Sequence, residues 1–195
     1  WTTCNRLVKL SRKKSGKHES VLNLILLKPL GIRNDYSKEE LPAHYSFQSK
    51  QAENNFSELF KDKKVRLILH PMSHGSAREW NIDHFRRLMD LLPAEKFSIY
   101  ITGGPNEKDR LEFALKELPP HVQNVAGNFS LPELISFIGQ CDGIVAASTG
   151  PLHIAAALGK FAVGLYPPIE PMDPSRWAPL GKNACSMVVN KKCDD

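Results

Sequence analysis

The sequence predicts an α/β domain with a doubly wound parallel sheet, and three observations support this fold class. From Val65 onward, short apolar runs alternate with longer segments whose apolar residues recur with helical periodicity. The apolar runs contain Val and Ile, and Gly or Pro bounds several of them, which is typical of buried strands. Strands and helices that alternate at this spacing indicate βαβ units, in which right-handed crossovers make the strands parallel.

Individual elements follow from local patterns after residue 64. We expect strands at residues 65–70, 96–104, 123–127, 142–147 and 161–168, and helices at residues 81–92, 106–118, 131–140 and 150–158. In the first of these helices one face collects the apolar residues Ile82, Phe85, Leu88, Met89 and Leu92. Pro119 stops the second helix, Ser130 caps the third, and Gly159 ends the fourth.

The first third of the chain lacks this regular alternation. Residues 18–30 form an amphipathic segment, which we expect to be a helix limited by Pro29. Residues 34–64 are rich in Lys, Glu, Asn and Gln, and we expect a connection there with a surface helix near residues 50–60. The chain therefore divides into a linker and helical segment at residues 1–64 and a ligand-binding α/β domain at residues 65–195.

The composition argues against several classes of protein. The chain has 195 residues, of which 42% are hydrophobic and 24% charged, as in ordinary globular domains. Its apolar runs are all shorter than the ~18 residues of a membrane span, and we expect no signal peptide. The four cysteines form no CxxC pair, so neither a zinc site nor a disulfide framework is indicated; they are Cys4, Cys141, Cys185 and Cys193.

The charge is positive, with a net value of +5 and a pI near 9.0. Basic residues cluster at residues 6–17 and again at Lys191 and Lys192. Because no aromatic residue is interleaved in the first cluster, a stacking surface for single-stranded nucleic acid is not indicated, and we expect no nucleic-acid partner. A solvated basic face is the first interpretation of this cluster, and contact with an anionic membrane surface is the second.

The turn STGPLH (148–153) joins a buried strand to an Ala-rich helix, at the sheet edge where ligands bind in this fold class. Ser148 or Thr149 is available there as the N-cap. Free amides and the positive end of the helix dipole suit an anion such as a phosphate. The alternative is a capped helix that binds nothing, and this stretch alone does not decide between the two.

Other loops at the same edge carry further candidates. Ser73 and neighbouring small residues would let amides approach a phosphate, whose charge Arg78 would neutralise. Glu107 either favours the dipole of the helix it begins or accepts hydrogen bonds from a ribose. His153 either has a structural role or donates to a phosphate or a sugar hydroxyl. Trp80 is expected to anchor the core. The simpler alternative, polar loops before capped helices, stays open.

Four segments together resemble glycosyltransferase family 9, the ADP-heptose:lipopolysaccharide heptosyltransferases and their relatives. They are HPMSHGSAREW (70–80), ITGGPNEKDR (101–110), residues 126–160 and residues 164–181. The family signature Asp-[Ser/Thr]-Gly-x-x-His matches the turn 148–153, with Ser148 in the place of the Asp. The resemblance runs from about residue 16 to residue 182 and covers the C-terminal half of such an enzyme.

That resemblance implies a Rossmann-like domain of the GT-B arrangement, in which two such domains face each other across the active site. The C-terminal domain holds a nucleotide-sugar donor similar to ADP-heptose. The acceptor domain, with its carboxylate general base, is expected to lie outside this chain, so no catalytic residue is nominated. The family implies an inverting transfer without a metal or other cofactor. The acceptor would be a lipopolysaccharide or related cell-envelope glycan, and the enzyme would be cytoplasmic, working at the inner membrane.

The resemblance also implies donor-binding roles for individual residues. Thr149, Gly150 and His153 would contact the diphosphate and the sugar. Glu107 would bind the ribose, and Phe129 would pack on the base. The complete expected set is Ser73, Arg78, Glu107, Phe129, Ser148, Thr149, Gly150, Pro151 and His153.

Three positions leave alternatives open. Arg78 stands where many relatives have a Lys that pairs with the phosphates, which keeps the charge but changes the geometry. Asp173 and Arg176 either close over the donor or form a structural turn. An alternative function for the chain as a whole is a nucleotide-binding or scaffolding module without transferase activity.

Overall fold

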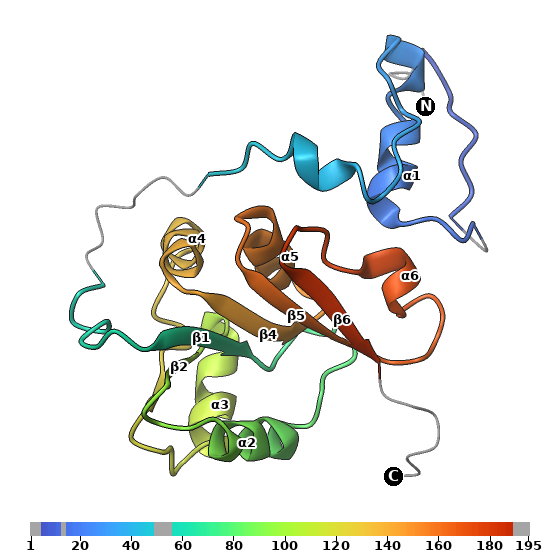
Figure 1. Cartoon of the computed structure of the whole chain (residues 1–195). Coiled ribbons are helices and arrows are strands. Elements are labelled where there is room, and N and C mark those ends of the chain that lie inside the picture. The colour runs from blue at the N-terminus through green and yellow to red at the C-terminus, as the bar shows by residue number, and fades with distance from the viewer. Residues whose placement is uncertain (1–4, 13–14, 49–55, 189–195) are drawn as a thin grey trace.

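A six-stranded parallel sheet forms the centre of the fold, in the computed structural model that describes residues 5–12, 15–48 and 56–188 (Figure 1). The strands lie in the order β3-β2-β1-β4-β5-β6. They are β1 (Val65–His70), β2 (Phe97–Ile101), β3 (Val122–Asn124), β4 (Gly143–Ala147), β5 (Phe161–Tyr166) and β6 (Ala184–Val188). This arrangement confirms the predicted doubly wound, Rossmann-like α/β fold class. The strand β6 has no counterpart in the sequence-based prediction.

The strand order reverses direction at one point in the sheet. β1 and β4 are neighbours, with His70 paired to Ala146 and Leu69 to Val145. The chain proceeds outward from β1 to β2 and β3, and then returns to β4 before continuing to β5 and β6. The order therefore reverses between β1 and β4, and the loops that leave their carboxyl ends diverge to opposite faces of the sheet. Such a switch point is where doubly wound folds bind ligands.

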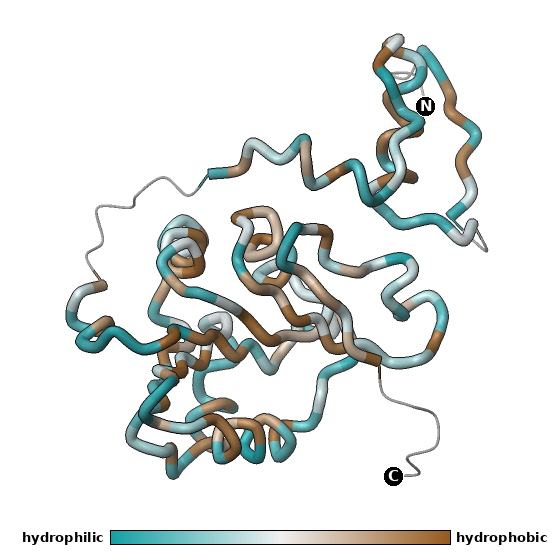
Figure 2. The backbone as a smooth tube through the Cα atoms, viewed as in Figure 1, coloured by the Kyte–Doolittle hydropathy of each residue, from teal (hydrophilic) through white to brown (hydrophobic). Residues whose placement is uncertain are grey.

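Helices cover both faces of the sheet. Above one face lie α4 (Leu131–Gln140) and α5 (Gly150–Ala157), which bury Phe137 and Leu152 against β1, β4 and β5. Against the other face lie α2 (Ile82–Leu91) and α3 (Lys108–Ala114), which bury Phe85 and Leu111. Figure 2 shows hydrophobic residues concentrated along the central strands, as three-layer packing requires.

After residue 64, helix boundaries agree with the sequence pattern except at α3. The expected helix 106–118 is a 3₁₀ turn at Pro105–Glu107 followed by α3, which ends at Ala114. Leu115 leaves the helical conformation, with φ −123° and ψ 46°, and its side chain is 4% exposed in the core. Burial of Leu115 therefore ends the helix before Pro119 is reached. Ser130 occupies the predicted N-cap position of α4, and its N–H donates to Glu133 Oε2 at 2.7 Å.

The N-terminal part folds differently from a single amphipathic helix. The helix α1 spans only Glu19–Ile25, and a separate 3₁₀ turn at Lys28–Leu30 contains Pro29. Within the surface helix expected near residues 50–60, residues 49–55 lie outside the described part of the chain. The following residues 56–60 form a turn that packs Phe56 and Phe60 against Phe137 of α4. The boundary near residue 64 stays a prediction.

Candidate functional site

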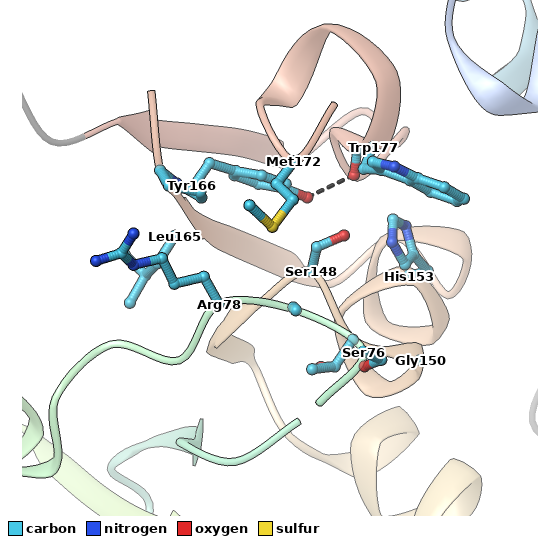
Figure 3. A pocket seen from close by; sticks show the side chains of 12 residues that line it. Ser76, Arg78, Ser148, Gly150, His153, Leu165, Tyr166, Met172 and Trp177 are labelled. Atoms are coloured by element: carbon cyan, nitrogen blue, oxygen red, sulfur yellow. Dashed lines mark hydrogen bonds between the residues drawn. The ribbon is translucent and has the colours of Figure 1, made fainter. Parts of the chain in front are cut away.

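A pocket of about 300 Å³ opens at the switch point of the sheet (Figure 3). One wall is the loop after β1, with Ser76, Ala77 and Arg78, and another is the turn after β4, which leads into α5. The remaining walls come from the end of β5 and from the segment that includes α6 (Pro174–Trp177). The complete lining is Ser76, Ala77, Arg78, Ser148, Thr149, Gly150, His153, Leu165, Tyr166, Pro167, Met172 and Trp177.

The turn at the start of α5 is open towards this pocket. Every residue of β4 is buried, so the strand delivers the turn to a defined position. Thr149 occupies the N-cap position, but its side chain makes no capping hydrogen bond, and its buried hydroxyl has no partner among the described residues. A Cβ atom added at Gly150 would meet nothing within 4 Å. Gly150 lines the pocket, so the start of α5 is open there, as an anion site at a helix N-terminus requires.

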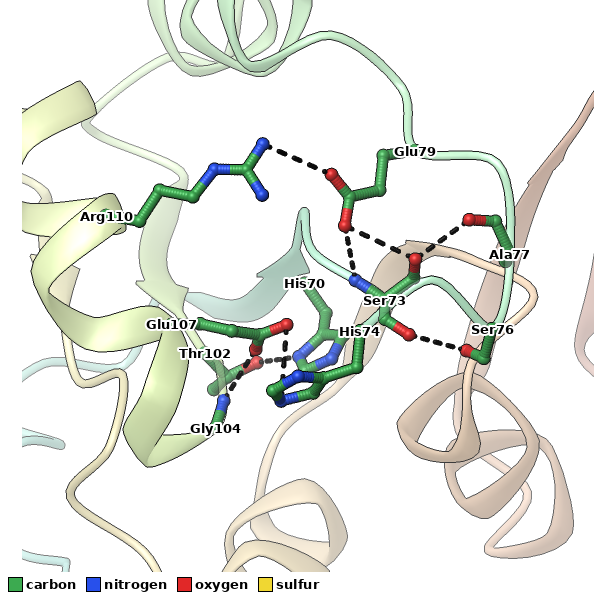
Figure 4. A network of polar contacts seen from close by, with 10 residues as sticks. All are labelled: His70, Ser73, His74, Ser76, Ala77, Glu79, Thr102, Gly104, Glu107 and Arg110. Carbon is green, nitrogen blue, oxygen red and sulfur yellow. Dashed lines mark hydrogen bonds and ion pairs between the residues drawn. The ribbon is translucent and has the colours of Figure 1, made fainter.

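The loop after β1 is held in shape by its own hydrogen bonds (Figure 4). Ser73 N–H donates to Glu79 Oε1 at 2.8 Å, and the Ser73 hydroxyl donates to the Ala77 carbonyl at 2.8 Å. The Ser76 hydroxyl donates to the Ser73 carbonyl at 2.7 Å. His74 and Gly75 both have positive φ, 49° and 75°, which makes the turn tight. Ser73 itself is buried in this loop and does not line the pocket, whereas Arg78 does.

The electrostatics of the pocket favour an anion. Arg78 is its charged lining residue, and no carboxylate stands among the described residues that form its walls. Burial, together with the nearby His18, lowers the pKa of His153, so its imidazole is neutral at neutral pH. Burial raises the pKa of Tyr166 to about 12, and its hydroxyl donates to the Trp177 carbonyl. The pocket therefore combines the cationic Arg78 with two uncharged polar side chains, those of His153 and Tyr166.

Glu107 lies in a separate polar network next to the loop after β1 (Figure 4). Its Oε2 accepts from Gly104 N–H at 2.7 Å at the start of the 3₁₀ turn, and its Oε1 lies 3.6 Å from Nε2 of His74. In the same network the buried His70 lies 2.9 Å from the Thr102 hydroxyl, joining the ends of β1 and β2. Glu107 thus has the capping role that its position predicts, and it does not line the 300 Å³ pocket.

Two further predicted residues lie away from the pocket lining. Phe129 packs edge-on against Phe56, with ring centroids 5.6 Å apart, and also contacts Phe137. Pro151 occupies the first turn of α5 behind Gly150. Of the nine expected donor-binding residues, the structure brings five together around one pocket: Arg78, Ser148, Thr149, Gly150 and His153.

The pocket also has walls that sequence reasoning missed. Met172 and Trp177 line it from the segment after β5. The only signal for them is that this segment follows a strand whose end, Tyr166, already marks the ligand-binding edge. Asp173, by contrast, accepts from Ser175 N–H at 2.7 Å and caps α6, and Arg176 pairs with Glu19, which supports the structural alternative for both.

A second cavity of about 460 Å³ adjoins the first and shares Arg78 and Tyr166 with it. Apolar side chains dominate its lining, including Leu88, Val163 and Met187. Trp80 stands at its border, partly buried, with its ring edge-on to Phe85 at 5.0 Å. That contact confirms Trp80 as a core anchor.

Two kinds of functional feature are absent from the described ranges. No group of three or more His, Cys, Asp or Glu side chains there is placed to hold a metal ion. The helices within residues 5–12, 15–48 and 56–188 include none long and apolar enough to cross a membrane. Of the cysteines, Cys141 is buried and Cys185 exposed, both as free thiols, while Cys4 and Cys193 lie outside the described residues.

Solved structures share this fold. A glycosyl transferase family 9 protein from Veillonella parvula superimposes with a TM-score of 0.68 at 18% identity, over 93% of this chain and 51% of that one. The Escherichia coli heptosyltransferase WaaC, solved with ADP, gives a TM-score of 0.63 at 21% identity, over 94% of this chain and 52% of that one. Both likenesses confirm the Rossmann-like domain.

Relatives identified by sequence are also heptosyltransferases. Lipooligosaccharide heptosyltransferase 2 of Haemophilus ducreyi is 34% identical over 116 residues, which are 56% of this chain and 32% of that protein. Lipopolysaccharide heptosyltransferase 3 of E. coli is 25% identical over 171 residues, 86% of this chain and 48% of that protein. The chain thus spans about half the length of these relatives or less. The model of glycosyltransferase family 9 (heptosyltransferase) matches residues 7–195, and the chain belongs to that family.

Proposed function

We propose that this chain binds the nucleotide-diphosphate sugar donor of a heptosyltransferase, with the diphosphate in the 300 Å³ pocket. One observation carries the proposal: Arg78 and the open first turn of α5 meet in one pocket at the β1/β4 switch point. The fold binds ligands at this point, and both groups suit an anion. The WaaC structures with ADP and with ADP-2-deoxy-2-fluoro heptose support a donor of the same chemical class.

Each wall of the pocket has a part in this proposal. The Arg78 guanidinium pairs with phosphate oxygens, and the amide of Gly150 donates to them. The Ser148 hydroxyl points into the pocket in Figure 3 and contacts the sugar or its adjoining phosphate. His153, one turn into α5, donates from its neutral imidazole. The Thr149 hydroxyl, buried and without a partner, gains one when the turn tightens around the diphosphate.

The nucleoside extends from the pocket towards β2 and β3. Glu107 and Phe129 follow these two strands, so the ribose and the base would approach them across the loop that contains Ser73. Glu107 already holds the Gly104 amide with one oxygen, and its other oxygen faces His74. The ribose hydroxyls would take the place of the His74 ring at that second oxygen.

The chemistry follows from where charge develops. As the bond between the anomeric carbon and the phosphate breaks, negative charge builds on the leaving nucleoside diphosphate. Arg78 and the α5 amides stabilise this charge from fixed positions, which is the largest contribution such a site makes. We propose that they do so without a metal. The acceptor hydroxyl, on a lipopolysaccharide-type glycan, attacks the opposite face of the sugar, and its proton goes to a carboxylate outside this pocket.

The basic N-terminal residues fit a role beside the membrane. Arg6, Lys9 and Lys17 are exposed, and charges of this kind are drawn to anionic lipid at a cytoplasmic surface. We propose that they keep the enzyme near its lipid-linked acceptor on that side. Co-sedimentation with vesicles that contain phosphatidylglycerol, compared with neutral vesicles, tests this proposal, and equal binding to the two would contradict it.

Calorimetric titration of this chain with ADP, UDP, GDP and ADP-heptose tests the donor site. We expect one nucleotide to bind more tightly than the others, and Arg78→Gln and His153→Gln each to weaken it about tenfold, since charged hydrogen bonds of about 1.5 kcal/mol are lost. Arg87→Gln, an exposed arginine on α2, is the matched control and should bind as the wild type does. Binding that is absent, or unaffected by Arg78→Gln, would overturn the proposal.

A further inference from the structure

The short helix α6 forms part of the pocket wall and has few internal contacts to fix its position. It has four residues, Pro174–Trp177, and none of them is buried. A helix of one turn is not stable by itself in water. The position of Trp177, and of Met172 just before the helix, must therefore come from contacts with other parts of the chain.

Glu19, at the start of α1, supplies the main contact. Its Oε2 accepts from Arg176 of α6, with Nε at 3.0 Å and Nη2 at 2.9 Å. Its Oε1 accepts from Arg12 Nε at 2.6 Å. Arg12 in turn donates from Nη2 to Asn23 Oδ1 at 3.1 Å. One carboxylate, whose side chain is 12% exposed, thus joins α6 to two parts of the N-terminal segment.

His18 adds a second contact, to the residue that follows α6. Its Nδ1 accepts from Ser20 N–H at 3.2 Å, so in the neutral ring the proton lies on Nε2. That Nε2 is 2.9 Å from the Ala178 carbonyl, to which it donates. Adjacent residues of the N-terminal segment therefore hold both Arg176 and the residue after α6.

The protonation states agree with these contacts. Burial alone would raise the pKa of Glu19, but the hydrogen bonds from Arg12 and Arg176 lower it overall, so the carboxylate is charged at neutral pH. Burial lowers the pKa of His18, so its ring is neutral and can accept from Ser20 while donating to Ala178. Charge-assisted hydrogen bonds to a largely buried carboxylate are stronger than exposed ion pairs.

We propose that Glu19 is a positioning residue for the donor pocket, which it shapes through Arg176 by holding Trp177 and Met172 against the opening. The identity of the ligand rests on the proposed function, but the position of the wall does not. By linkage, the N-terminal segment and the donor stabilise each other: a seated segment favours donor binding, and bound donor favours the seated segment.

Fluorine NMR on protein labelled with 5-fluorotryptophan reads out the wall without any ligand. The chain has three tryptophans, and Trp177→Phe assigns the Trp177 resonance. We expect Glu19→Gln and Arg176→Gln each to shift the Trp177 resonance while that of Trp80 stays in place. Glu40→Gln, which removes a carboxylate paired with Arg33 at 3.3 Å in the same N-terminal part, should shift neither.

Nucleotide affinity gives the second measurement. Glu19→Gln should weaken the binding of ADP about tenfold. The double variant Glu19→Gln/Arg176→Gln should bind ADP as tightly as either single variant does, because both substitutions remove the same link. An unchanged Trp177 resonance in Glu19→Gln, or a shift in that variant but none in Arg176→Gln, would overturn the positioning role. If the wild type binds no nucleotide, the donor proposal fails, while the fluorine spectra still decide the role of Glu19.

Discussion

The hydroxyl of Tyr166 donates a hydrogen bond to the main-chain carbonyl of Trp177 (Figure 3), which ties the segment after β5 back onto the end of that strand. Both residues line the pocket, and Tyr166 is 2% exposed. Because burial raises its pKa to about 12, the phenol remains a donor at any physiological pH. The bond adds to the contacts that Glu19 and His18 make with the neighbouring residues Arg176 and Ala178.

Tyr166→Phe should lower the free energy of unfolding by about 1–3 kcal/mol, because the Trp177 carbonyl loses its partner. Urea denaturation monitored by circular dichroism measures the change. Tyr45→Phe removes a hydroxyl from a side chain that is 41% exposed and should change stability by less than about 0.5 kcal/mol. Equal effects of the two substitutions would contradict the structural role of the Tyr166 hydroxyl.

Gly150, at the start of α5, and Gly181, which packs against Ala156 of α5, should respond differently to alanine. At Gly181 an added Cβ would lie 2.6 Å from the Ala156 carbonyl oxygen, and backbone cannot move aside cheaply, so Gly181→Ala should cost about 1–3 kcal/mol. At Gly150 the same atom meets nothing within 4 Å, so Gly150→Ala should leave stability almost unchanged.

The measurement for Gly150→Ala is therefore nucleotide binding. If the diphosphate occupies the space in front of this residue, the new methyl group should weaken ADP binding in calorimetry without altering the melting temperature. Wild-type affinity in Gly150→Ala would place the diphosphate elsewhere.

Stability should fall as the pH drops below the ordinary histidine pKa of 6.5. Burial lowers the pKa values of His18, His70 and His153 in the folded chain, so the unfolded chain binds protons more readily. Below 4.5 the loss should continue as Glu19, whose folded pKa is lowered by its two arginines against the opposing effect of burial, takes up a proton.

Thermal unfolding at about pH 7.5 and about pH 5.5 checks the histidine contribution. The melting temperature should be lower at the acid value, and His153→Gln should reduce the difference between the two. His44→Gln, at an exposed position, should not reduce it. A melting temperature that stays constant or rises on acidification would contradict the assignment of buried, neutral histidines.

The cysteines should differ in reactivity. Cys141 is 1% exposed, and burial raises its pKa to about 12, so almost no thiolate forms at neutral pH. Cys185 is exposed on β6. N-ethylmaleimide followed by peptide mass spectrometry should therefore find Cys185 modified well before Cys141. In denaturant the modification rates of the two thiols should become similar. Similar modification rates in the folded chain would contradict this expectation, because they would show that β4 and α4 open easily.

Local patterns predict some site residues better than others. The N-cap position of Ser130 and the strand leading to Ser148 depend on neighbours only a few residues away, so residue types and spacing suffice to identify them. The end of α3 could not be placed in this way, because Leu115 leaves the helix to fill the core between α2 and the sheet. Likewise, the Thr149 cap expected from its residue type does not form a hydrogen bond.

By itself, the sequence determined the fold class, the alternation of strands and helices, and the loops that could meet a ligand, because short apolar runs and a helical period of 3.6 residues can be recognised in each segment separately. Tertiary structure alone decided that Arg78 shares a pocket with Gly150 and that Glu107 does not line it. It also decided that Glu19 holds α6. These relations depend on strand order and on contacts between distant segments, which arise only when the whole core packs together.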